Sequence, residues 1–238
     1  MKEQKRRILV VDDEIKIVEV VKSYLQRDGY SVYSAYDGNT VMDMFDKVNP
    51  DLMILDLMLP DICGEKLCSI LRKKSKVPII MLTAKTSESD ILNGFDIGAD
   101  DYVIKPFSPK QLVARVKSLL RRTVDDKDIM DYIISIDNGR LTINNSSYEV
   151  KKSGSIVNLT PVEYNILTVM AGHPEKIFTR EELISIVLGK NFDGYNRAID
   201  SHIKNLRQKI EDNSRNPVYI LTVRGIGYKF GGIVEKRY

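Results

Sequence analysis

The sequence predicts two domains of different class: an α/β domain built on a parallel sheet, then an α+β domain with antiparallel strands. In the first half of the 238 residues, five short apolar runs alternate with five amphipathic segments. The stretch from Thr123 to Asp131 is acidic and shows no clear periodicity, which is typical of a linker. Beyond it, short strand candidates are separated by Asn138-Gly139 and Asn144-Asn145, which favour tight turns. We therefore expect domains at residues 5–122 and 133–235, joined by a linker at 123–132.

The strands of the first domain are predicted where apolar residues run without polar alternation, a pattern typical of a sheet buried on both faces. These runs are Ile8–Val11, Ser31–Ala35, Leu52–Leu55, Ile79–Thr83 and Tyr102–Ile104. Amphipathic segments predict helices near residues 14–28, 38–48, 64–74, 87–98 and 108–121. This alternation implies a doubly wound sheet, in which ligands bind at the carboxyl ends of the strands.

Polar side chains follow four of these strands, at the points where the strands end: Asp12, Asp13, Asp56, Thr83 and Lys105. Carboxylates in a poorly solvated cleft repel one another, and a Mg²⁺ ion would remove that repulsion. With the cation bound, Asp56 could act as a nucleophile and become an aspartyl phosphate. Lys105 would then pair with the phosphoryl oxygens, and Thr83 would donate its hydroxyl.

Two alternatives remain for these residues. An aspartate that follows a strand can simply cap the next helix, although this does not explain five polar residues at four strand ends. A phosphatase with an aspartyl nucleophile usually shows Asp-x-Asp. Here the run is Asp56-Leu57-Met58, which lacks the second carboxylate.

The second domain is predicted to open with short strands at about 133–136, 140–143 and 148–151. Capping boxes at Thr160–Glu163 and Thr179–Glu182 then open two helices. A loop containing two glycines, at 188–196, leads to a third helix at Arg197–Glu211. Two strands within Tyr219–Phe230 close the domain as a hairpin around Arg224-Gly225-Ile226-Gly227.

Charge is distributed unevenly along the chain. The whole chain has a formal charge of only +3. Residues 196–229 hold seven Lys and Arg against three Asp and Glu, a local excess of four positive charges. In the third helix, Ile199, Ile203, Leu206 and Ile210 share one face, and the opposite face is polar and basic. Such a face fits a DNA major groove, although in isolation it is better explained as a solvated helix surface.

The first 122 residues resemble the receiver domain of two-component response regulators. The matching stretches are Ile8–Glu14 (ILVVDDE), Leu55–Pro60 (LDLMLP), Thr83-Ala84 and Gly98–Phe107 (GADDYVIKPF). The resemblance implies a flavodoxin-like sheet with strand order 2-1-3-4-5. It also implies phosphorylation of Asp56 by a sensor histidine kinase, and Mg²⁺ held by Asp12, Asp13, Asp56 and the Met58 carbonyl. A cis Lys105-Pro106 bond is expected, as is a switch in which Thr83 and Tyr102 move. Tyr102 as ordinary core filling remains the alternative.

Residues 133–230 resemble the winged helix-turn-helix effector domain of the OmpR/PhoB family. The resemblance rests on Leu159–Tyr164, Thr179–Leu183, Arg197–Arg207 and Thr222–Tyr228. It implies phosphate contacts by Arg197, His202, Lys204, Arg207, Thr222 and Tyr228. Base contacts are implied for Asp200, Ser201 and Asn205, and a minor-groove contact for Arg224. Many relatives carry a basic residue in place of Asn205, so their preferred DNA sequence does not transfer. The loop 188–196 is expected to touch RNA polymerase.

The family resemblance further implies a homodimer that forms on phosphorylation and aligns two DNA-binding domains on a direct repeat. The expected charge pairs are Asp96 with Lys117, Asp100 with Arg122 and Asp101 with Arg115. Ile91 and Gln111 stand where the family usually places a cation and a carboxylate, so we expect a more apolar contact there. A constitutive DNA-binding protein that uses its receiver only to dimerise remains an open alternative.

Composition and segment character bound the remaining function classes. A hydrophobic content of 43% and a charged content of 29% are those of an ordinary globular protein. The apolar run after the basic Met1–Arg7 segment is too short for a signal peptide or a membrane span. Cys63 and Cys68 form no disulfide framework or metal motif and are expected to be reduced. These features predict a cytoplasmic protein, and the family resemblance implies a regulator and not an enzyme.

Overall fold

A computed structural model describes residues 5–84, 95–121, 133–188 and 198–237. The chain divides into two compact units, Met1–Arg121 and Arg122–Tyr238, which are taken separately below. The predicted linker at 123–132, the loop at 189–196 and most of the helix expected at 87–98 lie outside the described residues. Among the described helices, none combines the length and the apolar character needed to cross a membrane.

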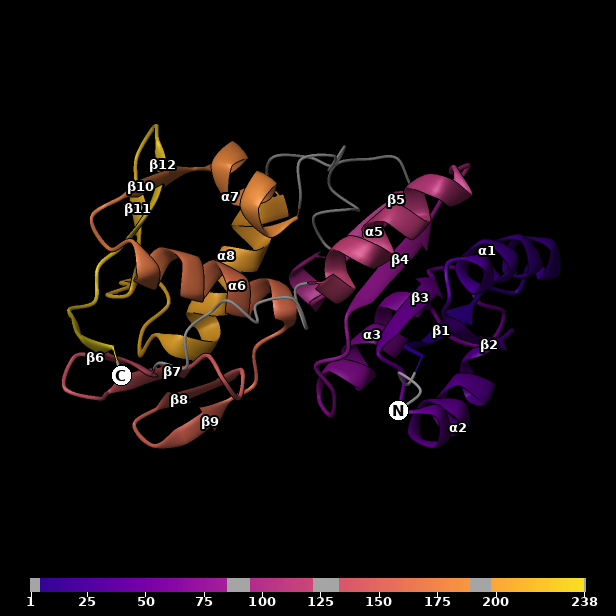
Figure 1. The fold of residues 1–238 in the computed structure, drawn as a ribbon, viewed down its shortest axis with the longest axis horizontal. Coiled ribbons are helices and arrows are strands. Elements are labelled where there is room, and N and C mark those ends of the chain that lie inside the picture. Colours follow the sequence, from indigo (N-terminus) through magenta and orange to yellow (C-terminus); the bar gives the residue numbers. More distant parts are fainter. Residues whose placement is uncertain (1–4, 85–94, 122–132, 189–197, 238) are drawn as a thin grey trace. The chain divides into compact units, whose positions relative to one another are not determined.

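The first unit contains the predicted parallel sheet, whose strand order is β2-β1-β3-β4-β5 (Figure 1). Its strands are β1 (Arg7–Val11), β2 (Ser31–Ala35), β3 (Leu52–Asp56), β4 (Ile79–Thr83) and β5 (Asp101–Ile104). Every residue of β3 and β4 is buried, which explains why their sequences lack polar alternation. The order predicted from the family resemblance is confirmed.

The described helices of this unit are α1 (Ile15–Arg27), α2 (Gly38–Val48), α3 (Gly64–Arg72) and α5 (Pro109–Arg121). Helices α1 and α5 pack against each other. An ion pair of 2.8 Å between Lys74 Nζ and Asp46 Oδ1 joins the end of α3 to α2. The prediction of 64–74 for α3 is two residues too long, because the chain leaves the helix after Arg72.

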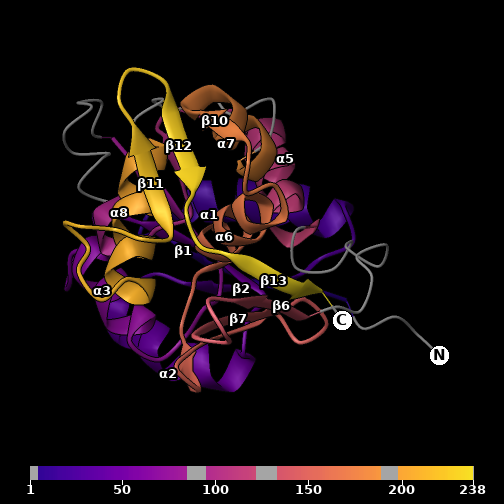
Figure 2. The same cartoon turned by 90° about the vertical axis from the view of Figure 1, so that its left-hand side faces the viewer.

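The second unit begins with an antiparallel sheet of order β13-β6-β7-β8-β9. Its strands are β6 (Ile133–Ile136), β7 (Leu141–Asn144), β8 (Glu149–Lys152), β9 (Ser155–Val157) and β13 (Val234–Arg237). The sequence predicted β6 at its observed bounds and predicted β7 and β8 one residue early. It gave no indication of β9 or β13. Strand β13 forms only because it pairs with β6, about a hundred residues earlier in the chain, as Figure 2 shows.

Three helices and a second sheet complete this unit. The helices are α6 (Pro161–Gly172), α7 (Arg180–Val187) and α8 (Ala198–Ile210). Both predicted capping boxes are present: the Thr160 and Thr179 side chains accept hydrogen bonds from the Glu163 and Glu182 backbone N–H groups. The second sheet has the order β10-β12-β11 and consists of β10 (Ile177–Thr179), β11 (Ile220–Val223) and β12 (Gly227–Phe230).

Helix α8 is anchored at several points in the second unit. Ile199, Ile203, Leu206 and Ile210 are each at most 1% exposed, so the predicted apolar face is the core face. The buried Glu211, just after α8, accepts hydrogen bonds from the N–H groups of Val218, Tyr219 and Ile220. This carboxylate fixes the start of β11 against the end of α8. The helix and the β11–β12 hairpin therefore form the winged-helix arrangement predicted from the sequence.

Candidate functional site

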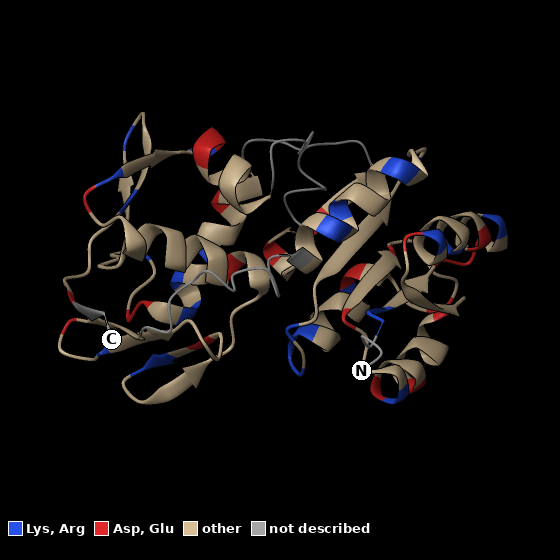
Figure 3. Cartoon of the chain, in the orientation of Figure 1, with Lys and Arg blue, Asp and Glu red and all other residues tan. Residues whose placement is uncertain are grey.

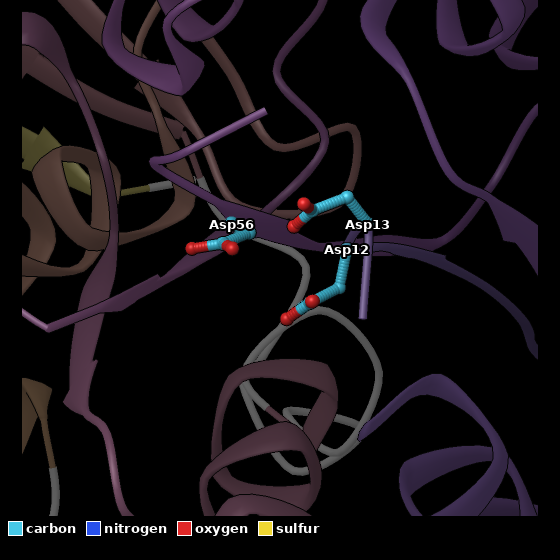
Figure 4. A group of neighbouring side chains, drawn as sticks. All are labelled: Asp12, Asp13 and Asp56. Atoms are coloured by element: carbon cyan, nitrogen blue, oxygen red, sulfur yellow. The ribbon is translucent and has the colours of Figure 1, made fainter. Parts of the chain in front are cut away.

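The carboxyl ends of β1, β3, β4 and β5 meet at one edge of the parallel sheet, as expected for a doubly wound fold. One carboxylate oxygen of each of Asp12, Asp13 and Asp56 lies within 4.8 Å of the others. Figure 4 shows these side chains projecting into the same region. Asp12 and Asp56 are buried, whereas Asp13 is exposed. The structure thus brings together three aspartates that are up to 44 positions apart in the sequence.

Lys105, just after β5, compensates part of this negative charge. Its Nζ atom lies 2.8 Å from Asp12 Oδ2 and 3.0 Å from Asp56 Oδ2. Glu14 Oε1 lies 3.3 Å from the same ammonium. Sequence reasoning missed Glu14, although it directly follows the Asp12-Asp13 pair. The predicted grouping of Lys105 with the aspartates is present in the structure.

Backbone contacts hold these strand ends together. The Lys105 N–H donates to the Thr83 carbonyl at 2.7 Å, and the Leu57 N–H donates to the Leu82 carbonyl at 3.1 Å. Thr83, 1% exposed, therefore stands beside the ends of β3 and β5. The Lys105–Pro106 peptide bond is cis, as expected from the sequence.

Burial and charge shape the electrostatics of the cluster. Burial raises the pKa of Asp12, and the hydrogen bond from Lys105 counteracts that rise. Burial opposes the charge on Lys105, but its hydrogen bonds to Asp12 and Asp56 outweigh this effect and raise its pKa. Three carboxylates, those of Asp12, Glu14 and Asp56, lie within 3.3 Å of one ammonium group, and Asp13 lies beside Asp12 and Asp56. Such a hard oxygen donor set with excess negative charge fits a divalent cation.

A short loop after β3 is tightly packed against the cluster. A Cβ atom on Gly64 would lie 2.2 Å from the Asp56 carbonyl oxygen, so only glycine allows α3 to approach this closely. The Gly64 N–H donates to the Leu57 carbonyl at 2.9 Å. Asp61 accepts from the N–H groups of Gly38 and Asn39, which ties the same loop to α2. Met58 lies within this loop and pairs with Cys63 in an isolated bridge.

Tyr102 points inward in this structure. It is 7% exposed, its hydroxyl donates to Met81 Sδ at 2.9 Å, and its ring packs 4.8 Å from that of Phe95. Burial raises the pKa of this phenol. The ring therefore fills core space here, and its predicted movement as part of a switch stays a prediction.

Several residues predicted to form a dimer interface have partners within one chain. Arg115 Nη1 bonds both carboxylate oxygens of Asp101 at 3.0 Å. Asp100, fully buried, pairs with Arg72 at 2.5 Å, and Lys117 pairs with Asp28 at 2.8 Å. Gln111 is exposed and Asp96 is half-buried, whereas Ile91 and Arg122 lie outside the described residues. Any pairing across a dimer would have to compete with these intrachain bonds.

The predicted DNA-contacting residues lie on α8 and on the β11–β12 hairpin. Of the residues predicted on α8, Lys204 is exposed, whereas Ser201, His202 and Asn205 are buried; Arg197 lies outside the described residues. Thr222 and Arg224 are exposed on the hairpin. Figure 3 shows basic and acidic residues interspersed along the described part of each unit.

Four predicted DNA-contacting residues form two hydrogen-bonded pairs within the second unit. The Tyr228 hydroxyl donates to Asp200 Oδ1 at 2.6 Å, and Arg207 Nη2 donates to Thr222 Oγ1 at 2.8 Å. Arg180 Nε also donates to Asp200 Oδ1, at 2.8 Å. Sequence reasoning gave Arg180 no role, although Thr179–Leu183 carries part of the family resemblance. Its spacing from Asp200 carried no signal, because the two residues meet only in the folded unit.

Comparisons with known proteins agree with this architecture. A family model for the response regulator receiver domain matches residues 8–117. A model for the C-terminal domain of transcriptional regulatory proteins matches residues 154–230. A cysteine-to-aspartate mutant of RitR is 26% identical, with a TM-score of 0.75, over 94% of this chain and 98% of that one.

The second solved structure is more similar in sequence. DrrB of Thermotoga maritima, described as an OmpR/PhoB homologue, is 33% identical to this chain. The match covers 96% of this chain and 100% of DrrB, with a TM-score of 0.51. The parallel sheet with its acidic strand ends and the winged-helix unit are the two parts expected of such a regulator. This chain therefore belongs to the OmpR/PhoB family of response regulators.

Proposed function

We propose that the chain is the response regulator of a two-component system and that Asp56 accepts a phosphoryl group from a sensor histidine kinase. The observation that carries this proposal is the cluster of Asp12, Asp13 and Asp56 with Lys105 at one edge of the sheet. A buried aspartate with a purely structural role would not require two further carboxylates and a lysine beside it. Phosphoryl transfer requires oxygen ligands that bind a cation, and it also requires a positively charged side chain near the phosphoryl group.

In the proposed reaction, an oxygen of the Asp56 carboxylate attacks phosphorus of the kinase phosphohistidine. The P–N bond breaks, a P–O bond forms and the electron pair returns to the imidazole. Lys105 exchanges its carboxylate contacts for the phosphoryl oxygens, and Thr83 donates its hydroxyl to them. Asp12, Asp13, Asp56 and the Met58 carbonyl would hold Mg²⁺, which supplies neutralisation of the charge on the transferred group. Beyond slow self-dephosphorylation, no catalytic turnover is proposed.

The output that we propose is sequence-specific binding to double-stranded promoter DNA, in the cytoplasm. Phosphorylation would promote a homodimer through the 87–98 segment, β5 and α5, placing two DNA-binding units on a direct repeat. Binding two sites together raises the effective local concentration without any new DNA contact. The loop at 188–196 would contact RNA polymerase. Ile91 and Gln111 would make the dimer contact more apolar than is usual in the family.

Phosphorylation by a small donor tests this proposal directly. With acetyl phosphate and Mg²⁺, intact-mass spectrometry should show one added phosphoryl group on the wild type and none on Asp56→Asn. Phosphorylated wild type should show a larger dimer fraction and higher affinity for a DNA duplex that it selects from a randomised pool. If Asp56→Asn binds that duplex as well as phosphorylated wild type, the receiver is only a constitutive dimerisation module.

A further inference from the structure

Tyr228 on β12 is the centre of a set of contacts that connects three elements of the second unit. Its hydroxyl donates to Asp200 Oδ1 on α8 at 2.6 Å, and the same oxygen accepts from Arg180 Nε on α7 at 2.8 Å. The guanidinium carbon of Arg180 lies 5.3 Å from the centre of the Tyr228 ring, and that of Arg207 lies 5.7 Å from it. These distances suit cation–π attraction on both contacts.

Arg207 extends this set from α8 to β11. Its Nε and Nη2 atoms both donate to the Ile220 carbonyl, at 2.9 and 2.5 Å. Nη2 also donates to Thr222 Oγ1 at 2.8 Å. Three of the five guanidinium N–H groups therefore have acceptors in the hairpin strand. The Arg207 guanidinium would have to break these hydrogen bonds in order to turn toward a DNA phosphate.

Where β12 leaves the hairpin turn, backbone packing leaves no space for a side chain. A Cβ atom on Gly227 would lie 2.0 Å from the Phe178 carbonyl oxygen of β10. In the turn itself, Gly225 has a φ of +76°, and the Ile226 N–H donates to the Val223 carbonyl at 3.0 Å. These contacts hold the tip end of the hairpin, and Arg207 and Tyr228 attach its strands to α8.

The protonation state of Tyr228 agrees with this arrangement. Burial, with a further contribution from the hydrogen bond to Asp200, raises the pKa of Tyr228 to about 12. The phenol is therefore neutral at physiological pH and acts as the donor to Asp200. Asp200 Oδ1 accepts hydrogen bonds from both Tyr228 and Arg180, so this oxygen is already hydrogen-bonded within the protein.

We propose that Asp200, Arg207 and Tyr228 form a hairpin clamp, which sets where the β11–β12 hairpin lies relative to α8. In DNA binding they act as positioning residues, so that Arg224 at the tip reaches its groove while α8 occupies the adjacent one. The base contact predicted for Asp200 and the phosphate contacts predicted for Arg207 and Tyr228 are replaced by this role. The inference rests on the proposed DNA-binding function.

Arg207→Lys separates positioning of the hairpin from contact with a DNA phosphate. It keeps the positive charge but loses the planar guanidinium that makes several hydrogen bonds at once. The full-length chain is used, phosphorylated by acetyl phosphate, with the duplex that wild type selects from a randomised pool. Hydroxyl-radical footprinting of Arg224→Ala first identifies the minor-groove protection that depends on the hairpin tip. In Arg207→Lys that same protection should be lost while the remaining footprint stays. Affinity should fall about tenfold, with an unchanged dependence on salt.

Lys204→Ala is the matched control, since Lys204 is exposed on the same helix. It should weaken binding and lower the slope of log K against log salt by about one, and leave the hairpin protection in place. Thr222→Val removes one acceptor of Arg207 without changing charge, and a partial loss of the same protection is expected. Thermal unfolding of each variant is measured as a control, to check that the second unit still folds.

Two results would overturn the clamp. In the first, Arg207→Lys keeps the full hairpin protection and binds DNA with near wild-type affinity. In addition, Arg207→Ala lowers the slope of log K against log salt as much as Lys204→Ala does. Arg207 would then be a phosphate contact. The second is a wild-type chain that selects no duplex, which removes the proposed DNA-binding function and the role of the clamp in it. If wild type selects a duplex but the Arg207 variants give the first result, only the clamp is overturned and the DNA-binding function stands.

Discussion

Lys105 Nζ lies 3.0 Å from the carboxylate of Asp56, the residue proposed to accept the phosphoryl group. The lysine thus neutralises the Asp56 carboxylate before phosphorylation. In the proposed reaction it would then pair with the phosphoryl oxygens instead. Asp12 shares the same ammonium at 2.8 Å, so a single cation stabilises two buried carboxylates. The consequence is that the resting site depends on this lysine for its stability as well as for its chemistry.

Replacing Lys105 by Met should therefore destabilise the first unit when divalent cations are absent. Removing one partner of a buried ion pair costs about 3–5 kcal/mol, because the remaining charges stay buried without compensation. Adding MgCl₂ should restore much of the loss, since the cation would take over the role of the ammonium. Urea unfolding with and without MgCl₂ measures both effects. Lys74→Met, which breaks the more exposed pair with Asp46, should cost less than about 1 kcal/mol. Equal losses in the two variants would contradict the argument.

Gly64→Ala should destabilise the first unit and disturb Asp56. The added Cβ would lie 2.2 Å from the Asp56 carbonyl oxygen and 2.8 Å from Leu57 Cα, both of them backbone atoms. Overpacking of this kind costs about 1–3 kcal/mol. It should also slow phosphorylation by acetyl phosphate, because the backbone that carries Asp56 has to move. Gly172→Ala, at the end of α6 with nothing within 4 Å, should leave both properties almost unchanged. A neutral Gly64→Ala would show that α3 can shift without affecting the site.

Asp61 should give a pH-dependent contribution to stability. The hydrogen bond from the Gly38 N–H, with further help from Asn39, holds the pKa of Asp61 below its ordinary value of 3.8. A lowered pKa in the folded state means that the stabilisation is present above 3.8 and is lost as pH falls through the folded-state pKa. Asp61→Asn should therefore be less stable than wild type near neutral pH, and the difference should shrink under acidic conditions. Urea unfolding across that range tests this prediction. Asp43→Asn, an exposed aspartate of α2, should show no comparable trend.

The two cysteines should differ sharply in reactivity. Cys63 is exposed, whereas Cys68 is buried and burial raises its pKa to about 11. Because the thiolate is the reactive form, Cys68 should resist iodoacetamide in the folded protein at mildly alkaline pH. Mass spectrometry should find one label on wild type, none on Cys63→Ser and two on the unfolded wild type. Labelling of folded Cys63→Ser would show that α3 opens readily.

The sequence indicated local structure well wherever the signal was itself local. The bounds of α2 were predicted to the residue, and both capping boxes occur where Thr and Glu stand three residues apart. The short strands β9, β10 and β13 were not predicted. Strands β10 and β13 have only three or four residues and pair with strands far away in the chain, so propensity alone cannot show them. Strand β9 pairs with the preceding β8 across Ser153-Gly154, a local turn signal that was overlooked.

The candidate site shows the same division. The residues of the acidic cluster could be predicted because parallel strands place their carboxyl ends at one edge of the sheet, whatever the details of packing. The partner of Asp100 could not be predicted. The sequence suggested Arg122 across a dimer, which stays a prediction, and it gave no sign of Arg72, which pairs with Asp100 in the same chain. Residue type shows that a buried carboxylate needs a cation, but it does not show which cation lies within reach.

By itself, then, the sequence determined the two domain classes, the order of the parallel strands, the acidic cluster around Asp56 and the core face of α8. The strand order follows from the family resemblance, and the other features follow from periodicity and motif spacing. Only the tertiary structure decided which groups Asp200, Arg207 and Tyr228 contact within the chain. Their residue types suit DNA, yet in the folded unit they bond to one another, to Arg180 and to β11. Hydrogen bonds act over about 3 Å, so the use of a polar group is decided by its neighbours in space, which the sequence does not display.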